Sequence, residues 1–477
     1  MFSLIKNELY KIFHKRSTKV LLLIMLGFVL LTNIIYKKSR DYYGRINDYR
    51  IGYNEAKAFI NNNEINKDNY EDYVYYETYI SVVELKDRYK EDWQVEVIDS
   101  EFYQLYYQYY LDKYFNNQDN IIKDKELIDS LLKDLDSGNW QSFVNARITN
   151  LKNELQTYKI ELNVNTSKRH ELELKKSIEI LEKEIELYEY RIKENLPIGG
   201  HTYLDNAINV VNGAKYEVIN AKYSNIDKYD LASTLKDYHI NEYILDNKVD
   251  ANNDKTLRGL LIDFYDEYDF LILVFVIMIA GSLVSDEYSK GTIKSLLILP
   301  YKRSKILLAK LLTMVIMILF GIFVLFIMQL VVGSIFFGIS SISISFVTYN
   351  IATESIVTMN VFKYFIILTT TIIPRILLLG TLAFAISTVI GNTAAAIAIT
   401  FCGYVGEVIV NTIAMRYHVE FLDYFVTTNW RFEQLLFGGR NQFNLSLTHG
   451  IIICSIYFLL MVIVSFIVFK KKDIKNI

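Results

Sequence analysis

One charged stretch, Ser285 to Lys310, separates two long apolar runs and carries the residue types most suited to a specific task. Ile293 and Leu297 recur at helical spacing, Gly291 permits a bend before them, and Pro300 ends a helix after them. A short helix of this kind can lie on a membrane and dock into a groove of a soluble partner. An ordinary turn that docks nothing is the alternative.

Two ionisable residues, Arg375 and Glu407, lie within other apolar runs. At ~1.5 Å per residue they are about 13 Å and about 10 Å from the outer ends of their runs, so the two side chains can meet. A lone charge at such a depth costs several kcal/mol, which favours pairing or a water-lined cavity. We expect a pair that faces a translocation path, or equally a structural pair that locks two helices together.

The sequence contains no pattern typical of a reaction centre. It has no G-x-x-x-x-G-K-[ST] phosphate loop, no H-E-x-x-H and no G-x-S-x-G, and its six histidines are dispersed. We therefore expect no catalytic residues, no enzyme activity, no metal site and no nucleic-acid partner for this chain.

Long apolar runs predict six membrane spans with both termini in the cytoplasm, because the loops richest in Lys and Arg belong on that side. The first 17 residues read as an amphipathic interfacial helix; the basic start of a secretory signal is the alternative. The predicted spans are 18–36, 264–284, 306–333, 364–390, 393–414 and 449–469, with cytoplasmic segments at 1–17, 285–305 and 470–477 and external segments at 37–263, 334–363 and a re-entrant loop at 415–448.

The polar region between the first two spans differs in character from the rest of the chain. Residues 37–265 hold 31 basic and 42 acidic side chains, and the two cysteines of the chain lie elsewhere, so no disulfide holds this region together. Heptad-spaced apolar residues at 146–194 predict an antiparallel coiled-coil hairpin, which would serve as a stalk or bind a substrate. The expected fold class is mostly α: a six-span helical membrane domain with an N-terminal interfacial helix and a large, largely helical extracellular domain.

The string E-x-x-x-G-T-I-K-x-L-L-x-x-P-x-x-R at 287–303, set between two spans, resembles the cytoplasmic loop of ABC-2 type permeases, the membrane subunits of type V ABC exporters. The large external insert looks like a Firmicutes subset of that family. The resemblance implies that a coupling helix in this loop meets a separate nucleotide-binding subunit. The residues that carry it are Glu287, Gly291, Thr292, Lys294, Leu297, Pro300 and Arg303.

This resemblance implies a permease subunit in a bacterial cell membrane, working as a dimer with a second copy or a paralogue and with two ABC ATPase chains. ATP and Mg would be bound by the ATPase, with no cofactor in this chain. The expected substrate is an antimicrobial peptide or drug, exported in self-protection, since an acidic external region attracts cations. The alternative is a membrane sensor or immunity protein that binds a peptide without transport.

Overall fold

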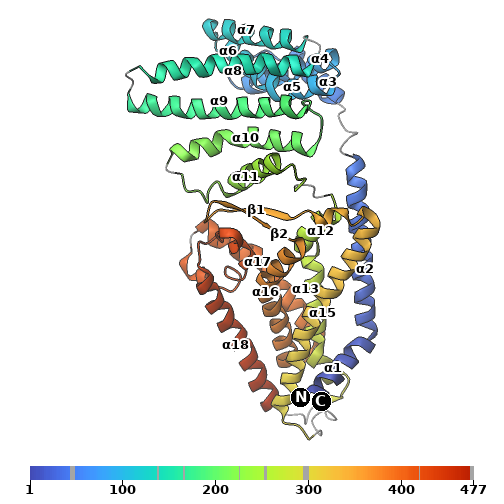
Figure 1. Ribbon diagram of the computed structural model, residues 1–477. Helices are drawn as coiled ribbons and strands as arrows, with labels where there is room; N and C mark the ends of the chain where they lie inside the picture. Colours follow the sequence, from blue (N-terminus) through green and yellow to red (C-terminus); the bar gives the residue numbers. More distant parts are fainter. Residues whose placement is uncertain are drawn as a thin grey trace. The chain divides into compact units, whose positions relative to one another are not determined.

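A computed structural model describes residues 1–42, 49–136, 139–164, 167–224, 226–251, 255–293, 300–417 and 419–472, and these are mostly helical (Figure 1). The chain divides into two compact units. Met1–Tyr42 and Ala251–Ile477 form the first, which we call the apolar unit, and Tyr43–Asp250 form the second, the polar unit.

The apolar unit contains the helices long and apolar enough to cross a membrane. Its elements are α1 (Phe2–His14), α2 (Arg16–Tyr42), α12 (Leu257–Ile262), α13 (Phe264–Ser289), α15 (Arg303–Phe337), η2 (Ser340–Ser343), β1 (Phe346–Asn350), β2 (Ser355–Met359), α16 (Val361–Ile390), α17 (Thr393–Tyr417), η3 (Glu420–Tyr424), η4 (Phe432–Gly438) and α18 (Leu447–Lys471).

Six helices in the described part of the chain qualify as membrane spans: α2, α13, α15, α16, α17 and α18. This confirms the number of spans predicted from the sequence, and most of the helices extend a few residues beyond the predicted limits. Between α15 and α16 the chain also forms an antiparallel hairpin of β1 and β2, in which Phe346 pairs with Met359 and Asn350 with Ser355. The sequence analysis did not predict these strands.

Helices α13 and α16 form the centre of the apolar unit, because 72% and 67% of the residues in their most apolar 18-residue stretches are buried. By contrast, only 17% of the residues in the corresponding stretches of α17 and of α18 are buried. A small residue allows α15 to approach the central helix α13. A Cβ atom on Gly321 of α15 would lie 2.5 Å from Cε1 of Phe275 on α13, so this crossing requires glycine.

Buried polar side chains connect α2 to the central helices. The Asn33 side-chain amide donates to Oε1 of Gln329 at 2.9 Å, and the Tyr268 hydroxyl donates to the same oxygen at 2.6 Å. All three residues are fully buried. A hydrogen bond between apolar helices has no competing water, so these contacts fix how α2 is rotated against α13 and α15.

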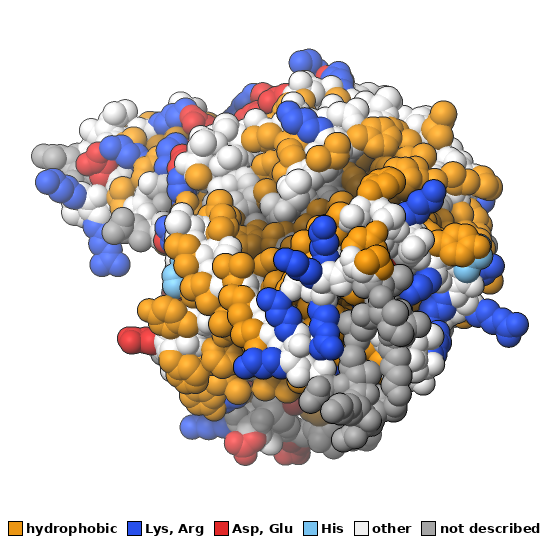
Figure 2. Space-filling model, turned by 90° about the horizontal axis from the view of Figure 1, so that it is seen from below, with side chains coloured by type: hydrophobic (Ala, Val, Ile, Leu, Met, Phe, Trp, Pro, Cys, Tyr) orange, Lys and Arg blue, Asp and Glu red, His pale blue; other side chains and the backbone are white. Residues whose placement is uncertain are grey.

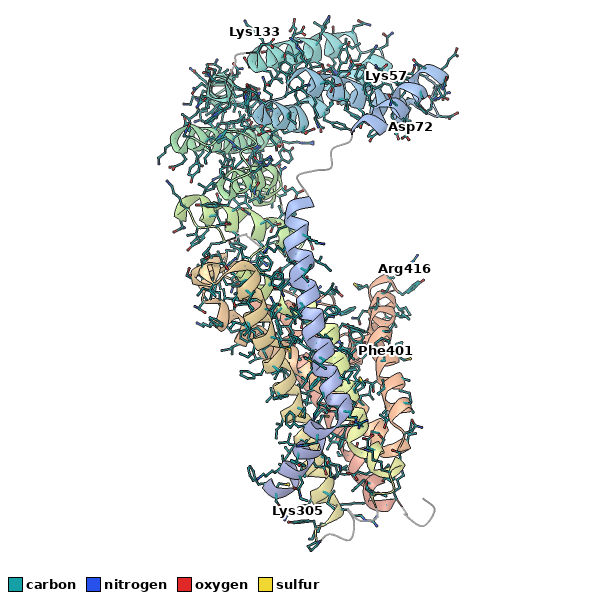
Figure 3. All side chains as sticks on the ribbon, turned by 90° about the vertical axis from the view of Figure 1, so that its right-hand side faces the viewer. Lys57, Asp72, Lys133, Lys305, Phe401 and Arg416 are labelled. Carbon is teal, nitrogen blue, oxygen red and sulfur yellow. The ribbon has the colours of Figure 1, made fainter. Side chains whose placement is uncertain are left out.

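One end of the apolar unit gathers α1, the end of α13, the start of α15 and the end of α18 (Figure 1). Arg303 donates to the Lys470 carbonyl oxygen at 3.0 Å, and Lys472 donates to the Val389 carbonyl oxygen at 3.0 Å. Seen from this end, the surface shows many Lys and Arg side chains (Figure 2). Figure 3 shows Lys305 at this end of the unit and Arg416, the last basic residue of α17, at the other.

The polar unit is built from helices alone in its described residues. They are α3 (Tyr49–Asn62), α4 (Tyr70–Arg88), α5 (Asp92–Val97), η1 (Ile98–Phe102), α6 (Tyr103–Tyr114), α7 (Gln118–Leu135), α8 (Trp140–Leu162), α9 (Lys168–Glu194), α10 (Tyr203–Tyr223) and α11 (Ala232–Asn247). Its core is aromatic as well as aliphatic, with Phe102, Phe143 and Leu135 fully buried. The η1 segment is a π-helical turn between α5 and α6.

Helices α8 and α9 lie side by side within the polar unit (Figure 1). Among the ion pairs that link them are Arg147 with Glu184, Lys152 with Glu189 and Lys159 with Glu182. Residue numbers rise along α8 between the last two pairs and fall along α9, so the helices run antiparallel there. Ile148 and Leu151 of the predicted seam on α8 are buried, as are Leu181 and Ile185 on α9.

Candidate functional site

The residues expected to meet a partner lie between α13 and α15. Glu287 is on the last turn of α13, and Gly291 follows it with a φ of 68°, a conformation that glycine adopts without strain. Thr292 and Pro300 are exposed, and Arg303 begins α15. Lys294 and Leu297, with most of the predicted coupling helix, lie outside the described residues.

Glu287 belongs to a buried ionic network centred on Lys310, a side chain that is 1% exposed on the third turn of α15. The Lys310 ammonium group donates to Glu8 Oε2 at 2.6 Å, to the Leu283 carbonyl oxygen at 2.8 Å and to Glu287 Oε1 at 3.3 Å. All three N–H donors of the ammonium therefore have an acceptor. A buried charge is tolerated only where it is paired in this way.

Lys11 completes the network from its solvent side. Its ammonium group lies 2.8 Å from Glu287 Oε1 and 3.2 Å from Glu8 Oε1. Burial alone would lower the pKa of Lys11, but the two carboxylates outweigh that effect and raise it. Two cations and two anions thus neutralise one another, and Thr292 adds a hydrogen bond from its hydroxyl to Glu287.

The partners from α1 were missed by sequence analysis, which considered only the apolar face of that helix. Its buried residues are Leu4, Glu8 and Ile12, which are four residues apart and therefore share one face of the helix. The buried face of α1 thus has a carboxylate at its centre. Helix α1 packs on α15 and α2. The available signal was Lys310 itself, a charge inside an apolar run that demands a partner.

A cavity of about 870 Å³ opens beside this network, between α1 and the junction of α13 with α15. Glu8, Lys11, Glu287 and Thr292 line it, and Lys15 pairs with Asp286 at 2.8 Å on its rim. We call the network of Glu8, Lys11, Glu287 and Lys310 the ionic junction, because it joins α1, α13 and α15.

The predicted pair of Arg375 and Glu407 is wrong as a direct contact, because each side chain has another partner. Arg375 of α16 binds Asp269 of α13 at 2.5 Å, and Glu407 of α17 binds Arg431 at 2.5 Å. Helical depth placed both charges at similar levels, but depth does not determine which side of a helix a residue occupies. The sequence analysis singled out neither Asp269, in the predicted span 264–284, nor Arg431, in the predicted loop 415–448.

These two pairs are close to each other and to a fifth charge, Glu433, whose Oε2 atom is buried without a hydrogen-bond partner in the described structure. Burial raises the pKa of Glu433, although Arg375 and Arg431 act in the opposite direction. Three carboxylates share two guanidinium groups here. The cluster therefore joins α13, α16 and α17 to the loop before α18, and holds an excess of one carboxylate.

No group of three or more His, Cys, Asp or Glu side chains in the described ranges has an arrangement that could hold a metal ion. Both ionic clusters of the apolar unit are instead occupied by Lys or Arg.

Residues 233–475 match the family described as "Protein of unknown function (DUF2705)". The match covers half of the chain and includes α13, α15, α16, α17 and α18. This chain belongs to that family. Glu287, Lys310 and both pairs near Arg375 lie inside the matched region, whereas Glu8 and Lys11 precede it.

Two proteins of Bacillus subtilis (strain 168) are similar to this member of the DUF2705 family. "Uncharacterized protein YhcI" is 26% identical over 241 residues, which are 50% of this chain and 75% of that protein. "Uncharacterized membrane protein YdbK" is 24% identical over 228 residues, 48% of this chain and 87% of that protein. No solved structure matches. A relative described as a membrane protein and the six apolar helices together indicate a multi-pass membrane protein.

Proposed function

We propose that this chain is the permease subunit of a bacterial ABC exporter of the ABC-2 type. Export would be driven by ATP hydrolysis on a separate subunit, with Mg and ATP held there and none in this chain. An antimicrobial peptide or drug is the proposed substrate. The resemblance of 287–303 to the family's cytoplasmic loop motivates the proposal, and the ionic network around Lys310 is the observation that carries it.

A loop that receives force from a partner needs a rigid connection to the spans, and the network supplies one. Glu287 stands at the boundary between span and loop, and Lys310 joins it to α15 and to α1. Moving the two charges of a buried ion pair apart costs much free energy, because each charge is then buried without a partner. Motion of the segment after Glu287 would therefore move three helices together, as alternating access requires.

The proposed orientation follows from charge. The end of the apolar unit that holds α1 and the start of α15 carries Lys6, Lys11, Lys15, Lys290 and Lys302, together with further basic residues at the ends of α15 and α18. Excess Lys and Arg favours the cytoplasmic side, so both termini would lie inside. Residues 37–263, with the coiled-coil hairpin, would then be extracellular.

The proposed assembly contains two permease chains, identical or paralogous, two ABC ATPase chains and the lipid bilayer. The poorly buried helices α17 and α18 leave many apolar side chains exposed, Phe401 of α17 among them (Figure 3). Such surface needs lipid or a second protein chain to cover it.

The test is co-purification of the tagged chain from its native membrane, followed by mass spectrometry and an ATPase assay in proteoliposomes. An ATPase subunit with Walker motifs should co-purify in equal amount with the permease, and its activity should depend on the loop. A deletion of 287–303 and the variant Lys310→Met should each uncouple ATPase activity from added substrate. The matched control is Lys305→Met, an exposed lysine on the same helix.

Two results would reject the proposal. Substrate-stimulated ATPase activity that survives the loop deletion would show that force does not pass through this segment. Co-purification with a histidine kinase in place of an ATPase would favour the membrane sensor or immunity protein.

A further inference from the structure

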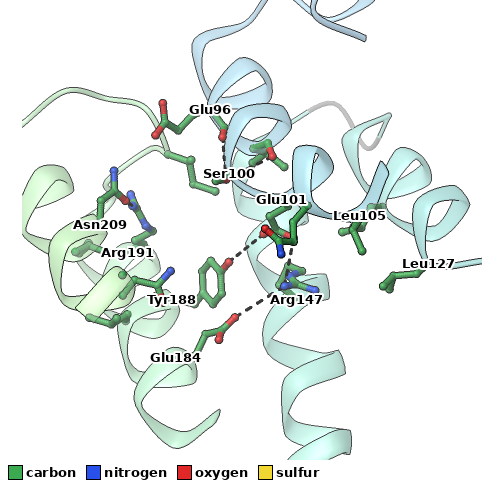
Figure 4. Close-up of a pocket in the computed structure, with 18 residues that line it drawn as sticks. Glu96, Ser100, Glu101, Leu105, Leu127, Arg147, Glu184, Tyr188, Arg191 and Asn209 are labelled. Atoms are coloured by element: carbon green, nitrogen blue, oxygen red, sulfur yellow. Dashed lines mark hydrogen bonds and ion pairs between the residues drawn. The ribbon is translucent and has the colours of Figure 1, made fainter. Parts of the chain in front are cut away.

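A second cavity, of about 530 Å³, lies wholly within the polar unit and is separate from both ionic clusters described above. Its volume is in the range of roughly 300–1,000 Å³ typical of ligand sites. It is half-open, and residues of α5, η1, α6, α7, α8, α9 and α10 contribute to its wall. In Figure 4, Glu101, Arg147 and Glu184 meet around Tyr188, and Glu96 lies apart from them.

The polar wall has more carboxylates than cations to satisfy them. Arg147 lies 3.3 Å from Glu101 Oε2 and 3.8 Å from Glu184 Oε1, so one guanidinium group serves two acids (Figure 4). Lys215 approaches Glu184 at 3.1 Å. The remaining lining cation, Arg191, is used by Asp205 at 2.5 Å.

Glu96 is the carboxylate in excess. It lines the cavity from α5, and no described side chain or backbone N–H donates a hydrogen bond to its carboxylate or pairs with it. Only its backbone carbonyl oxygen is engaged, by the Ser100 hydroxyl at 2.8 Å. This acid is therefore available to a cation that enters from outside.

The guanidinium group of Arg147 also lines the cavity. A ligand with a carbonyl oxygen can accept a hydrogen bond from this group where it faces the cavity. A cationic group for Glu96 and a carbonyl for Arg147 are both present in a peptide residue with a basic side chain.

Apolar side chains complete the wall. Leu105 and Leu127 face each other across one side of the cavity, and Leu127 is 43% exposed there (Figure 4). The π-helical turn at η1 carries Ser100 and Glu101 into the wall, and such turns occur frequently at functional sites. The cavity therefore combines surplus negative charge with an apolar surface.

We infer that this cavity of the polar unit binds a cationic, amphipathic peptide segment, with a basic side chain at Glu96, a backbone carbonyl at Arg147 and an apolar side chain on Leu105 and Leu127. Binding requires neither ATP nor a partner. That the bound peptide is exported rests on the proposed function.

The test measures binding of fluorescent, amidated octapeptides to the full chain in nanodiscs of phosphatidylcholine, by anisotropy, with empty nanodiscs as the blank. The probes alternate lysine with leucine, glutamate with leucine, or lysine with serine. The lysine–leucine peptide should bind most tightly. Glu96→Gln should weaken its binding roughly tenfold, since it removes a charge-assisted hydrogen bond. Glu126→Gln, an exposed acid outside the cavity, should leave binding unchanged.

A second pair of variants tests the apolar wall. Leu127→Asn should weaken binding of the lysine–leucine peptide, whereas Ile122→Asn, on the same helix but outside the cavity, should not. Unchanged binding in both Glu96→Gln and Leu127→Asn would overturn the inference, as would equal binding of the glutamate–leucine peptide. Peptide binding without ATP-driven transport in the reconstituted complex would keep this site and reject only the export proposal.

Discussion

Replacement of Lys310 by methionine tests the ionic junction directly. The side chain is 1% exposed and is bound by two carboxylates and a carbonyl oxygen. Methionine fills a similar volume but leaves Glu8 and Glu287 facing each other, with Lys11 as their remaining cation. Breaking a buried pair by removal of one partner costs roughly 3–5 kcal/mol, and we expect a loss of that order.

Removal of both charges separates pairing from packing. In the double variant Glu8→Gln with Lys310→Met, one anion and one cation leave together, so the network stays neutral. The losses of unfolding free energy in the two single variants should add up to roughly 1–3 kcal/mol more than the loss in the double variant. This difference is the usual coupling energy for residues in one ionic network. Their contact of 2.6 Å is the shortest of the junction that involves Lys310.

The assay is unfolding of the purified chain in mixed micelles with increasing SDS, followed by circular dichroism. Lys305→Met changes an exposed lysine closer to the start of α15 and should change the free energy of unfolding by less than about 0.5 kcal/mol. A Lys310→Met variant as stable as Lys305→Met, or additive single losses in the double variant, would refute the junction.

Three further predictions concern the apolar unit and use the same unfolding assay. Reversal of either charge in the pair Asp269–Arg375 should destabilise the protein, and Asp269→Arg with Arg375→Asp should recover at least half of that loss; no recovery would mean that the two do not pair. Gly321→Val should cost about 1–3 kcal/mol by overpacking, whereas Gly27→Ala, where an added Cβ meets nothing within 4 Å, should be neutral or stabilising. The pKa of Lys11 is raised above its ordinary value of 10.5, so its stabilising contribution is complete below that pH and disappears as pH rises through the folded-state pKa. The stability difference between wild type and Lys11→Met should therefore be constant from pH 7 to 9 and shrink above pH 10.5; a difference that stays constant to pH 12 would exclude this linkage.

The sequence was sufficient to locate the membrane helices. A span requires a run of apolar residues long enough for the hydrocarbon core, and that property is local, so each of the six runs lies within a helix, although most of the helices are longer than predicted. Local periodicity also identified the apolar positions of α8 and α9, because residues spaced by three and four share one face of a helix. The strands β1 and β2 were not predicted, since five-residue segments in a loop carry too weak a pattern.

Local sequence patterns did not identify which charged residues pair with each other. Lys310 lies 302 residues from Glu8, and Arg375 lies 106 residues from Asp269. A charge inside an apolar run shows that a partner must exist, but the partner depends on how separate helices are rotated and how deeply they sit. For that reason the sequence suggested Arg375 with Glu407, whereas the folded chain gives each a different neighbour.

The number of spans and the acidic polar region were determined by the sequence by itself, because apolar length and charge are properties of contiguous residues. Only the tertiary structure decided that Glu8 reaches Lys310 and that Glu96 lines a cavity with Arg147. The physical reason is that a buried charge or a cavity wall is assembled from helices distant in sequence, and its composition is fixed by packing.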